Sequence, residues 1–367
     1  MKYERPAYKQ PGIEVETRTR PFSSDTMTIP ILEYPITPKE NFYRSAKRDN
    51  PLWVPNSATD FDSYTMGTGL TPPPAMGGMW GGTERREFTD AWGVETVFVP
   101  EAGGPMHKPG SVFMDDITTW ETKVKFPEYG ENWEEAAKHF METRYNPDRP
   151  LRVNIGQGLT ERLVALMGGY TLYCEAIVVE PEATLAFFNK LSDYMVGYVE
   201  RMLELVPYDF ITYHDDWGTE KETFYSDKMM EELIFEPTKR IVAACKSKGA
   251  AFELHSCGNI ERFVPYMIDL DIDFIQIQRR ANDVPLLKEK YGDKIGFNSF
   301  IERTGADYPN LSIEEYCERV RETVDLYAGG GGMYSSASGY TDEHAWAGTF
   351  ELFCYSREFY DKEQGRD

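Results

Sequence analysis

The sequence is short of basic residues. Its 367 residues include 39 lysines and arginines against 61 aspartates and glutamates, which gives a formal net charge of -22. A surface this negative repels phosphate backbones and anionic lipid headgroups. We therefore expect neither nucleic acid nor membrane surfaces among the partners of this protein.

Long apolar runs and the features of a secreted protein are also missing. No apolar run approaches the roughly 18 residues that a membrane-spanning helix needs. Met1–Pro6 lacks the basic-then-apolar pattern of a secretion signal. The five cysteines are scattered and odd in number, which disfavours a disulfide scaffold and favours a reducing compartment. The predicted location is the cytoplasm.

Apolar strand-like segments alternate with amphipathic helical segments from about residue 150 onward. The predicted strands are Leu151–Ile155, Phe210–Tyr213, Ala251–Leu254, Phe274–Ile277, Ile295–Asn298 and Met333–Ser335. The predicted helices lie near residues 183–205, 227–248, 260–269, 283–291, 312–327 and 343–361. Pro237 is predicted to break or kink the second helix. Repeated βα units imply parallel strands, which suit either a doubly wound sheet or a closed barrel.

A glycine-rich turn after an early strand, which a dinucleotide-binding sheet normally has, is absent, and Gly329–Gly332 comes before its strand. The sequence therefore predicts a (β/α)8 TIM barrel as one domain over residues 51–367. An irregular N-terminal arm over residues 1–50 precedes it, with a short helix at Asn41–Lys47. Residues 52–120 are dense in Gly and Pro and are predicted to form long loops and short hairpins, with one strand at Trp92–Val99.

Two polar clusters lie where predicted strands end. His214, Asp215 and Asp216 follow one strand, and Glu253, His255 and Cys257 lie at the end of the next. In a (β/α)8 barrel, the carboxyl ends of the strands aim side chains at a shared site. The period of two in a strand puts His214 and Asp216 on one side and Glu253, His255 and Cys257 on one side.

These residue types suit metal binding and proton transfer. The imidazole of His255 and the thiol of Cys257 together suit zinc, which has three protein ligands in catalytic sites. The pair could equally be core residues. His214, Asp215 and Asp216 are the predicted catalytic residues, for proton transfer or polar substrate binding. Asp215 and Asp216 could also cap a helix.

Taken in order, these segments resemble the uroporphyrinogen decarboxylase superfamily, particularly its corrinoid-linked methyltransferase-like branch. The resemblance is carried by Asn41–Pro55, His214–Gly218, Pro237, His255–Asn259, Leu286–Gly292, Ile295–Asn298 and Gly329–Gly332. It implies a (β/α)8 barrel whose active site opens at the carboxyl ends of the strands. Decarboxylases of the family grip carboxylates with an Arg-Gln-Ala-Gly-Arg motif. This motif is missing here; Arg44 and Lys47 lie near its place without its spacing.

The methyltransferase branch is similar in its His-x-Cys pair, which implies zinc held by His255, Cys257 and a later cysteine. Ser335–Ser338 stands where that cysteine is expected. A serine hydroxyl is a far poorer zinc ligand than a thiolate. Glu253 and Asp216 are the available oxygen donors, and Glu253 is the predicted third ligand.

The function that the resemblance implies is methyl transfer in a corrinoid-dependent system. The methyl group would pass between a small methylated or methoxylated substrate, or a thiol acceptor, and a corrinoid protein. Homodimers are common in the family, so a homodimer is one expected arrangement. Two alternatives stay open: a lyase acting on another carboxylated substrate, where Asp215 or Asp216 stabilises a cation, and a non-catalytic protein that binds a tetrapyrrole or corrinoid.

Overall fold

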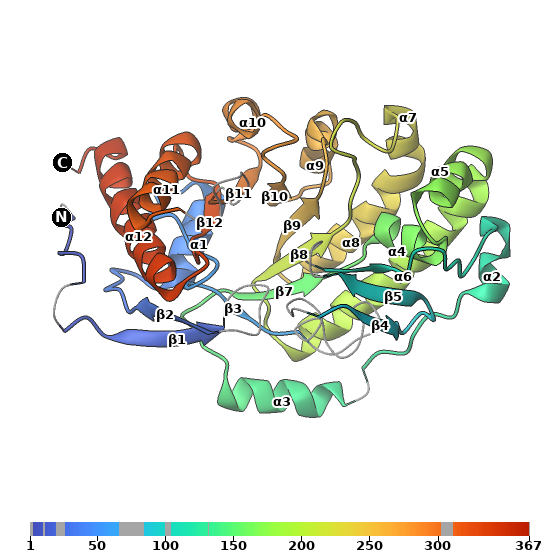
Figure 1. Ribbon diagram of the computed structural model, residues 1–367, viewed down its shortest axis with the longest axis horizontal. Helices are drawn as coiled ribbons and strands as arrows, with labels where there is room; N and C mark the ends of the chain where they lie inside the picture. The colour runs from blue at the N-terminus through green and yellow to red at the C-terminus, as the bar shows by residue number, and fades with distance from the viewer. Residues whose placement is uncertain are drawn as a thin grey trace.

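The computed structural model describes residues 3–9, 12–19, 26–65, 84–99, 104–130, 132–301 and 311–366. Over these residues, seven parallel strands form one curled sheet in the order β12-β11-β10-β9-β8-β7-β3 (Figure 1). Their bounds are β3 (Asp62–Ser63), β7 (Leu151–Ile155), β8 (Phe210–His214), β9 (Ala251–Ser256), β10 (Phe274–Ile277), β11 (Gly296–Phe300) and β12 (Met333–Ser336). The six strands predicted from the sequence are all present, because each is a short segment that contains β-branched or aromatic residues between polar or glycine boundaries.

The two edges of this sheet meet through the chain that precedes β3. Asn56 forms a parallel bridge with Ser335 of β12, and the Ser57 N–H donates to the Ser335 carbonyl at 2.8 Å. Six residues after Asn56, β3 pairs with β7 through Asp62 and Leu151. The sheet is thereby joined on both sides, as the predicted (β/α)8 class requires.

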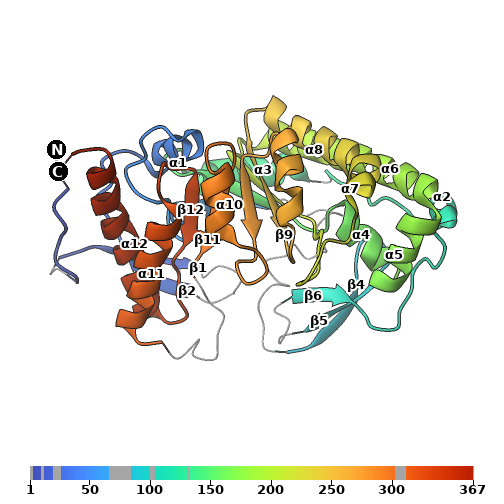
Figure 2. The same cartoon turned by 90° about the horizontal axis from the view of Figure 1, so that it is seen from above.

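Helices follow the strands and cover the outside of the sheet (Figures 1 and 2). After β7 come α4 (Leu159–Leu166), α5 (Tyr170–Val179) and α6 (Pro181–Leu205). The later helices are α7 (Asp227–Met229), α8 (Phe235–Ser247), α9 (Val264–Asp269), α10 (Val284–Tyr291), α11 (Ile313–Tyr327) and α12 (Asp342–Glu363). The helices predicted after residue 180 are therefore confirmed, within a few residues at their ends.

The break predicted at Pro237 lies about one turn earlier in the chain. Residues Met230–Ile234 form a π-helical turn between α7 and α8, and Pro237 lies in the first turn of α8. Proline lacks the N–H that would bond to the carbonyl four residues before it, and its ring crowds that carbonyl. The distortion therefore falls on the turn before the proline.

The first fifty residues hold more regular structure than the sequence predicts. β1 (Val15–Thr19) and β2 (Thr26–Pro30) pair antiparallel, and α1 (Pro38–Lys47) contains the predicted short helix. Phe42 of α1 is fully buried among four rings at the amino end of the barrel: Phe61, Phe210, Phe274 and Tyr334. The end of the arm therefore closes the bottom of the barrel.

The predicted loop region contains a small antiparallel sheet. β4 (Arg86–Thr89), β5 (Glu95–Val99) and β6 (Gly104–His107) pair in that order. The strand predicted at Trp92–Val99 begins only at Glu95, because Asp90 accepts the N–H groups of Trp92 and Val94 and forms a turn there. Figure 2 shows this sheet on the side of the barrel toward which β9 points. Residues 66–83 and 100–103 of the region lie outside the described residues.

Two further helices lie in the chain between the small sheet and β7. α2 (Trp120–Lys123) follows a 3₁₀ turn at Ile117–Thr119, and α3 (Trp133–Thr143) packs along α6.

Within the described chain, no single helix has the length and hydropathy to cross a membrane; α4 and α5 meet the criteria only as a pair bent by 111°. All five cysteines are free thiols.

Candidate metal centre

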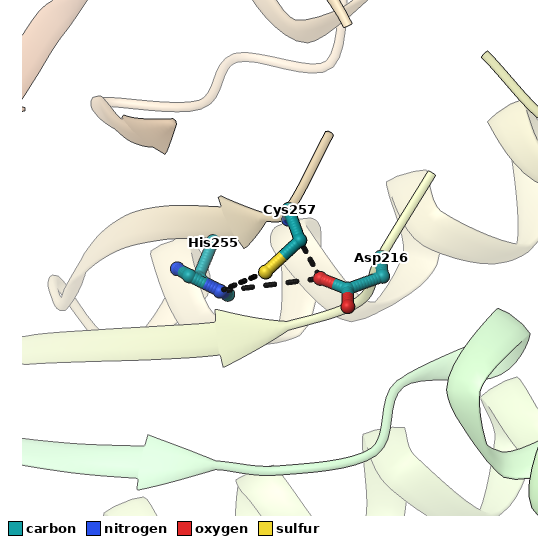
Figure 3. A group of neighbouring side chains, drawn as sticks. All are labelled: Asp216, His255 and Cys257. Carbon is teal, nitrogen blue, oxygen red and sulfur yellow. Dashed lines mark hydrogen bonds and ion pairs between the residues drawn. The ribbon is translucent and has the colours of Figure 1, made fainter. Parts of the chain in front are cut away.

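Three potential metal ligands converge at the carboxyl ends of β8 and β9. His255 lies within β9, Cys257 follows it directly, and Asp216 comes two residues after β8. One ligand atom of each lies within 4.8 Å of the others (Figure 3). Parallel pairing of β8 with β9 aligns His214 with His255, so the residues just beyond them meet at the same edge.

Two of the distances between these donor atoms are close to those in a tetrahedral zinc site. The Cys257 Sγ is 3.6 Å from the His255 Nε2, which is 3.9 Å from the Asp216 Oδ1. Ligands at about 2.0–2.3 Å from a tetrahedral ion are roughly 3.3–3.8 Å apart. The side chains of His255 and Asp216 are still 21% and 19% exposed, so the donor set opens toward the barrel mouth. The three residues fit zinc with an open fourth position.

Neighbouring groups orient two of these donors. The His255 Nδ1 hydrogen-bonds to the Gln276 Oε1 on β10. Because the amide oxygen only accepts, Nδ1 carries the proton, and the Nε2 lone pair faces Cys257 and Asp216. The Cys257 N–H donates to the Asp216 Oδ1 at 2.7 Å. Burial and the charge of Asp216 raise the pKa of the Cys257 thiol, so without a cation the thiol holds its proton.

The structure places His214 beside the donor set and not within it. Its ring lies 4.6 Å from the ring of His255, centroid to centroid. Burial, followed by the neighbouring His255 and Arg152, lowers the pKa of His214 well below its ordinary value. His214 is therefore a neutral imidazole next to the candidate ligands.

Asp215 hydrogen-bonds to the start of a helix, which is the kind of capping role that the sequence left open for it. Its Oδ1 accepts the N–H groups of Thr160 and Glu161 at the start of α4, and its Oδ2 accepts the Trp217 indole N–H. The residue is fully buried, and burial raises its pKa to about 7 despite these bonds. Asp215 thus caps the start of α4, and its catalytic role stays a prediction.

Glu253, the predicted third ligand, lies deeper in the barrel and does not belong to the donor set. Its carboxylate bonds to the Tyr334 hydroxyl, to Thr212 and to Asn298. Burial raises its pKa to about 7. Asp216, which the sequence assigned to proton transfer and also gave as an available oxygen donor, takes the place beside His255 and Cys257.

Sequence reasoning missed Glu161, a carboxylate in the first turn of α4. Its Oε2 accepts the Gln157 N–H at 3.0 Å. Burial, then the charges of Asp216 and Asp215, raises the pKa of Glu161 well above its ordinary value. The signal was available, since a glutamate two residues after Leu159 opens the helix that follows a barrel strand, but only the fold brings it beside Asp216.

The resemblance implies arginines near Arg44 and Lys47 and a cysteine near Ser335–Ser338, and this chain has other residues in both segments. The first segment lies away from the donor set, and the second lacks a metal-binding side chain. Arg44 pairs with Glu40 at 2.7 Å on α1, and the Lys47 Nζ lies over the Tyr43 ring. Both cations are therefore at the closed end of the barrel. In the serine segment, the Ser336 Oγ is buried and has no hydrogen-bond partner among the described residues.

Comparison with known proteins adds a family and a fold. The family model described as uroporphyrinogen decarboxylase (URO-D) matches residues 89–296, more than half of the chain. A solved methyltransferase from Methanosarcina mazei is similar at a TM-score of 0.57 and 13% identity, covering 89% of this chain and 99% of its own. No curated protein sequence matches.

A sugar phosphate isomerase/epimerase from Parabacteroides distasonis is similar over 61% of this chain and 82% of its own. Its TM-score is 0.32 and its identity 12%. This likeness is too distant to carry an argument about the site.

Proposed function

The chain belongs to the uroporphyrinogen decarboxylase family, and from this premise we propose that it is a zinc-assisted methyltransferase of a corrinoid-dependent system. The single observation that supports the proposal is the convergence of Asp216, His255 and Cys257 at the carboxyl ends of the strands. The fold likeness to a solved methyltransferase agrees with it.

A bound zinc ion would supply a Lewis acid that polarises the oxygen of a methoxylated donor or lowers the pKa of a thiol. His255, Cys257 and Asp216 would hold it, and Gln276 keeps the His255 Nε2 available for it. In the donor direction, the methyl group would pass to reduced cobalt on a separate corrinoid protein. His214 and Glu161, next to the donor set, are the groups we propose to move the accompanying proton.

The alternative of porphyrinogen decarboxylation has little support in this chain. A substrate with many carboxylates needs cationic side chains at the mouth. Arg44 and Lys47, the nearest counterparts of the family's arginines, lie on α1 at the opposite end. The formal charge of -22 would further repel such a substrate.

The metal part of the proposal is tested by zinc analysis of purified protein. We expect about one zinc per chain in the wild type, and loss of most of it in Asp216→Asn, His255→Ala and Cys257→Ser. Gln276→Leu should weaken zinc binding about 10- to 100-fold, because it removes the bond that orients His255. His139→Ala, an exposed histidine on α3, serves as the matched control and should retain zinc. A wild type that stays free of zinc after metal-replete expression contradicts this part.

The transfer part needs cob(I)alamin and a panel of methoxylated compounds. We expect methylcobalamin to form with at least one donor, and this activity to fall with the zinc content of the variants above. Release of CO₂ from a carboxylated substrate without corrinoid would instead favour the lyase. Tight tetrapyrrole binding without turnover, unchanged in the variants, would favour a carrier protein.

A further inference from the structure

Two cations meet at the closed end of the barrel, where the chain turns into β12. The turn is Gly330–Gly332, whose residues have left-handed φ angles of 70°, 76° and 63°. The Lys288 Nζ, from α10, donates to the Gly331 carbonyl at 2.5 Å. A Cβ on Gly332 would lie 3.1 Å from the guanidinium carbon of Arg48, the residue that ends α1. Both cations therefore border the same two glycines, and both are half-buried.

Neither cation forms an ion pair with a carboxylate among the described residues. The Arg48 Nε donates to the Gly292 carbonyl at 2.6 Å, and its Nη1 donates to the Ala46 carbonyl at 3.1 Å. The Arg48 Nη2 is buried and has no hydrogen-bond partner in this part of the structure. Lys288 donates to the Gly331 carbonyl, which leaves further N–H groups of its ammonium for another acceptor. Two positive charges are thus held close together with unused donors.

The carboxylates whose charges act on these two cations are those of Glu363, Asp273 and Asp293. Glu363 accepts the Gly330 N–H at 2.9 Å. Asp273 pairs with Lys246 at 2.9 Å. Asp293 is exposed, so water and salt screen its charge. These groups leave Arg48 and Lys288 without a direct acidic partner.

Arg48 has a backbone conformation that favours glycine. Its φ and ψ angles are 57° and 31°, the left-handed region in which a Cβ crowds the backbone. Glycine is the usual residue at such a helix end. Side chains that persist in this conformation are often those that a protein uses. The bond to Gly292 closes the end of α10, but it uses Nε and leaves Nη2 unexplained.

We propose that Arg48 and Lys288 bind an oxyanion of the phosphate type, either inorganic phosphate or a phosphate ester, at the closed end of the barrel. A planar guanidinium and a compact ammonium together match the several acceptor oxygens of a phosphate group. The bound anion accepts from the Arg48 Nη2 and from Lys288, and it offsets the repulsion between the two cations. Figure 2 shows α1 on the side of the barrel away from the small sheet, so this site is separate from the candidate metal centre.

The test is calorimetric titration of the purified protein with sodium phosphate at about pH 7 and constant ionic strength, with sodium chloride as the control salt. We expect about one phosphate to bind per chain and to saturate. Lys288→Met should weaken binding at least about tenfold, because it removes a charge-assisted hydrogen bond. Arg48→Gly should do the same, and glycine suits the left-handed conformation, so this variant should fold. Lys288→Arg keeps the charge and should keep most of the affinity.

Two control variants locate the bound anion. Lys290→Met removes an exposed lysine from the same helix, where its Nζ lies over the Tyr291 ring, and should bind phosphate as the wild type does. His255→Ala should also bind it normally, because the proposed site does not involve the metal centre. Lack of saturable binding by the wild type, or wild-type affinity in Arg48→Gly and Lys288→Met, overturns the inference. Loss of binding in His255→Ala would place the anion at the metal centre and overturns it equally.

Urea unfolding separates binding from a purely structural role of the two side chains. Phosphate stabilises many proteins as an excluded salt, so the measure is the gain of the wild type relative to that of Arg48→Gly. We expect phosphate to raise the unfolding midpoint more in the wild type. Equal gains would show that both side chains only join α1 and α10 to the glycine turn, and would contradict the proposal.

Glycerol phosphate, titrated in the same way, identifies the source of the anion. Tighter binding than inorganic phosphate supports the site with a phosphate ester as its ligand. Weaker binding that still depends on Arg48 and Lys288 supports the site with the free ion as its ligand.

Discussion

Glu253, His255 and Cys257 share one face of β9 and its extension, yet they lie in different layers of the barrel. Two residues along a strand advance by about 6.6 Å. Glu253 is therefore too deep to reach an ion held by the His255 Nε2, and it bonds instead to Thr212, Asn298 and Tyr334. The chain turns after Ser256, which brings the Cys257 Sγ back toward the imidazole.

The substitution Glu253→Gln tests whether this residue lies outside the metal site. We expect zinc content to stay at the wild-type level, because the residue lies outside the donor set. The free energy of unfolding should fall by about 1–3 kcal/mol, since the amide cannot serve all the buried donors that the carboxylate accepts from. Metal analysis and urea unfolding measure the two effects. Loss of zinc from this variant would restore Glu253 as a ligand.

Lys288 lies at the closed end of the barrel, and we expect it to make the stability of the fold depend on pH. Its ammonium donates to the Gly331 carbonyl, and burial, then the nearby Arg48, lowers its pKa from 10.5 to about 8. Between these two pKa values, the unfolded chain binds a proton that the folded chain has released. The contribution of Lys288 to the free energy of unfolding is therefore least favourable below about pH 8 and rises with pH across this range.

Lys288→Met removes this titration. The stability of the wild type minus that of the variant should rise by about 2–3 kcal/mol as the pH increases from about 8 to about 10.5. Urea unfolding of both proteins across this range gives the difference at each pH. Loss of the hydrogen bond to Gly331 lowers the free energy of unfolding of the variant by the same amount at every pH. Parallel curves of this free energy against pH for the two proteins would therefore show that Lys288 titrates normally.

Among the elements, α1 shows how a segment with a weak sequence pattern becomes part of the core. Thr37 caps its start by accepting the Glu40 N–H, and Pro38 suits its first turn. The Phe42 ring then lies 5.0 to 6.5 Å from four other rings at the amino end of the barrel. The helix closes the barrel because this one side chain fills the space between strand ends.

Phe42→Ala tests this closure. We expect the free energy of unfolding to fall by about 3–5 kcal/mol, from lost apolar burial and the cavity left behind. Urea unfolding measures the loss, and zinc content should not change because the site lies at the opposite end. Tyr43→Ala, on the same helix but only partly buried, should cost less. Equal losses from both variants would argue against a specific role of Phe42.

At the scale of the whole molecule, a buried ion pair joins the small antiparallel sheet to the barrel. Arg162 of α4 donates to Asp90, from the turn between β4 and β5, at 2.7 Å, and both side chains are essentially unexposed. The Arg162 guanidinium also lies 4.7 Å from the centre of the Trp92 ring. This charge pair and the contact with the Trp92 ring help to hold the sheet beside the mouth.

Arg162→Met should lower the free energy of unfolding by about 3–5 kcal/mol, because it leaves the Asp90 carboxylate buried without its cation. Hydrogen exchange should also increase in β4, β5 and β6, which lose their link to α4. Arg201→Met, which breaks the exposed pair with Glu134, should cost at most about 1 kcal/mol. Equal costs for the two variants would contradict the proposed link.

The amino-acid sequence alone predicts the alternation of strands and helices after residue 150, because apolar periodicity and glycine or proline boundaries are local properties. It also placed His214–Asp216 and Glu253–Cys257 at one end of the sheet, because parallel strands end at a common edge. Which of these side chains meet depends on the packing of the folded chain. Glu253 lies in a deeper layer of the barrel than the donor set, and Asp215 hydrogen-bonds to the start of α4. Glu161 and Gln276 lie beside the donor set although they belong to other elements of the fold. Contacts across the barrel have no signal in neighbouring residues of the sequence.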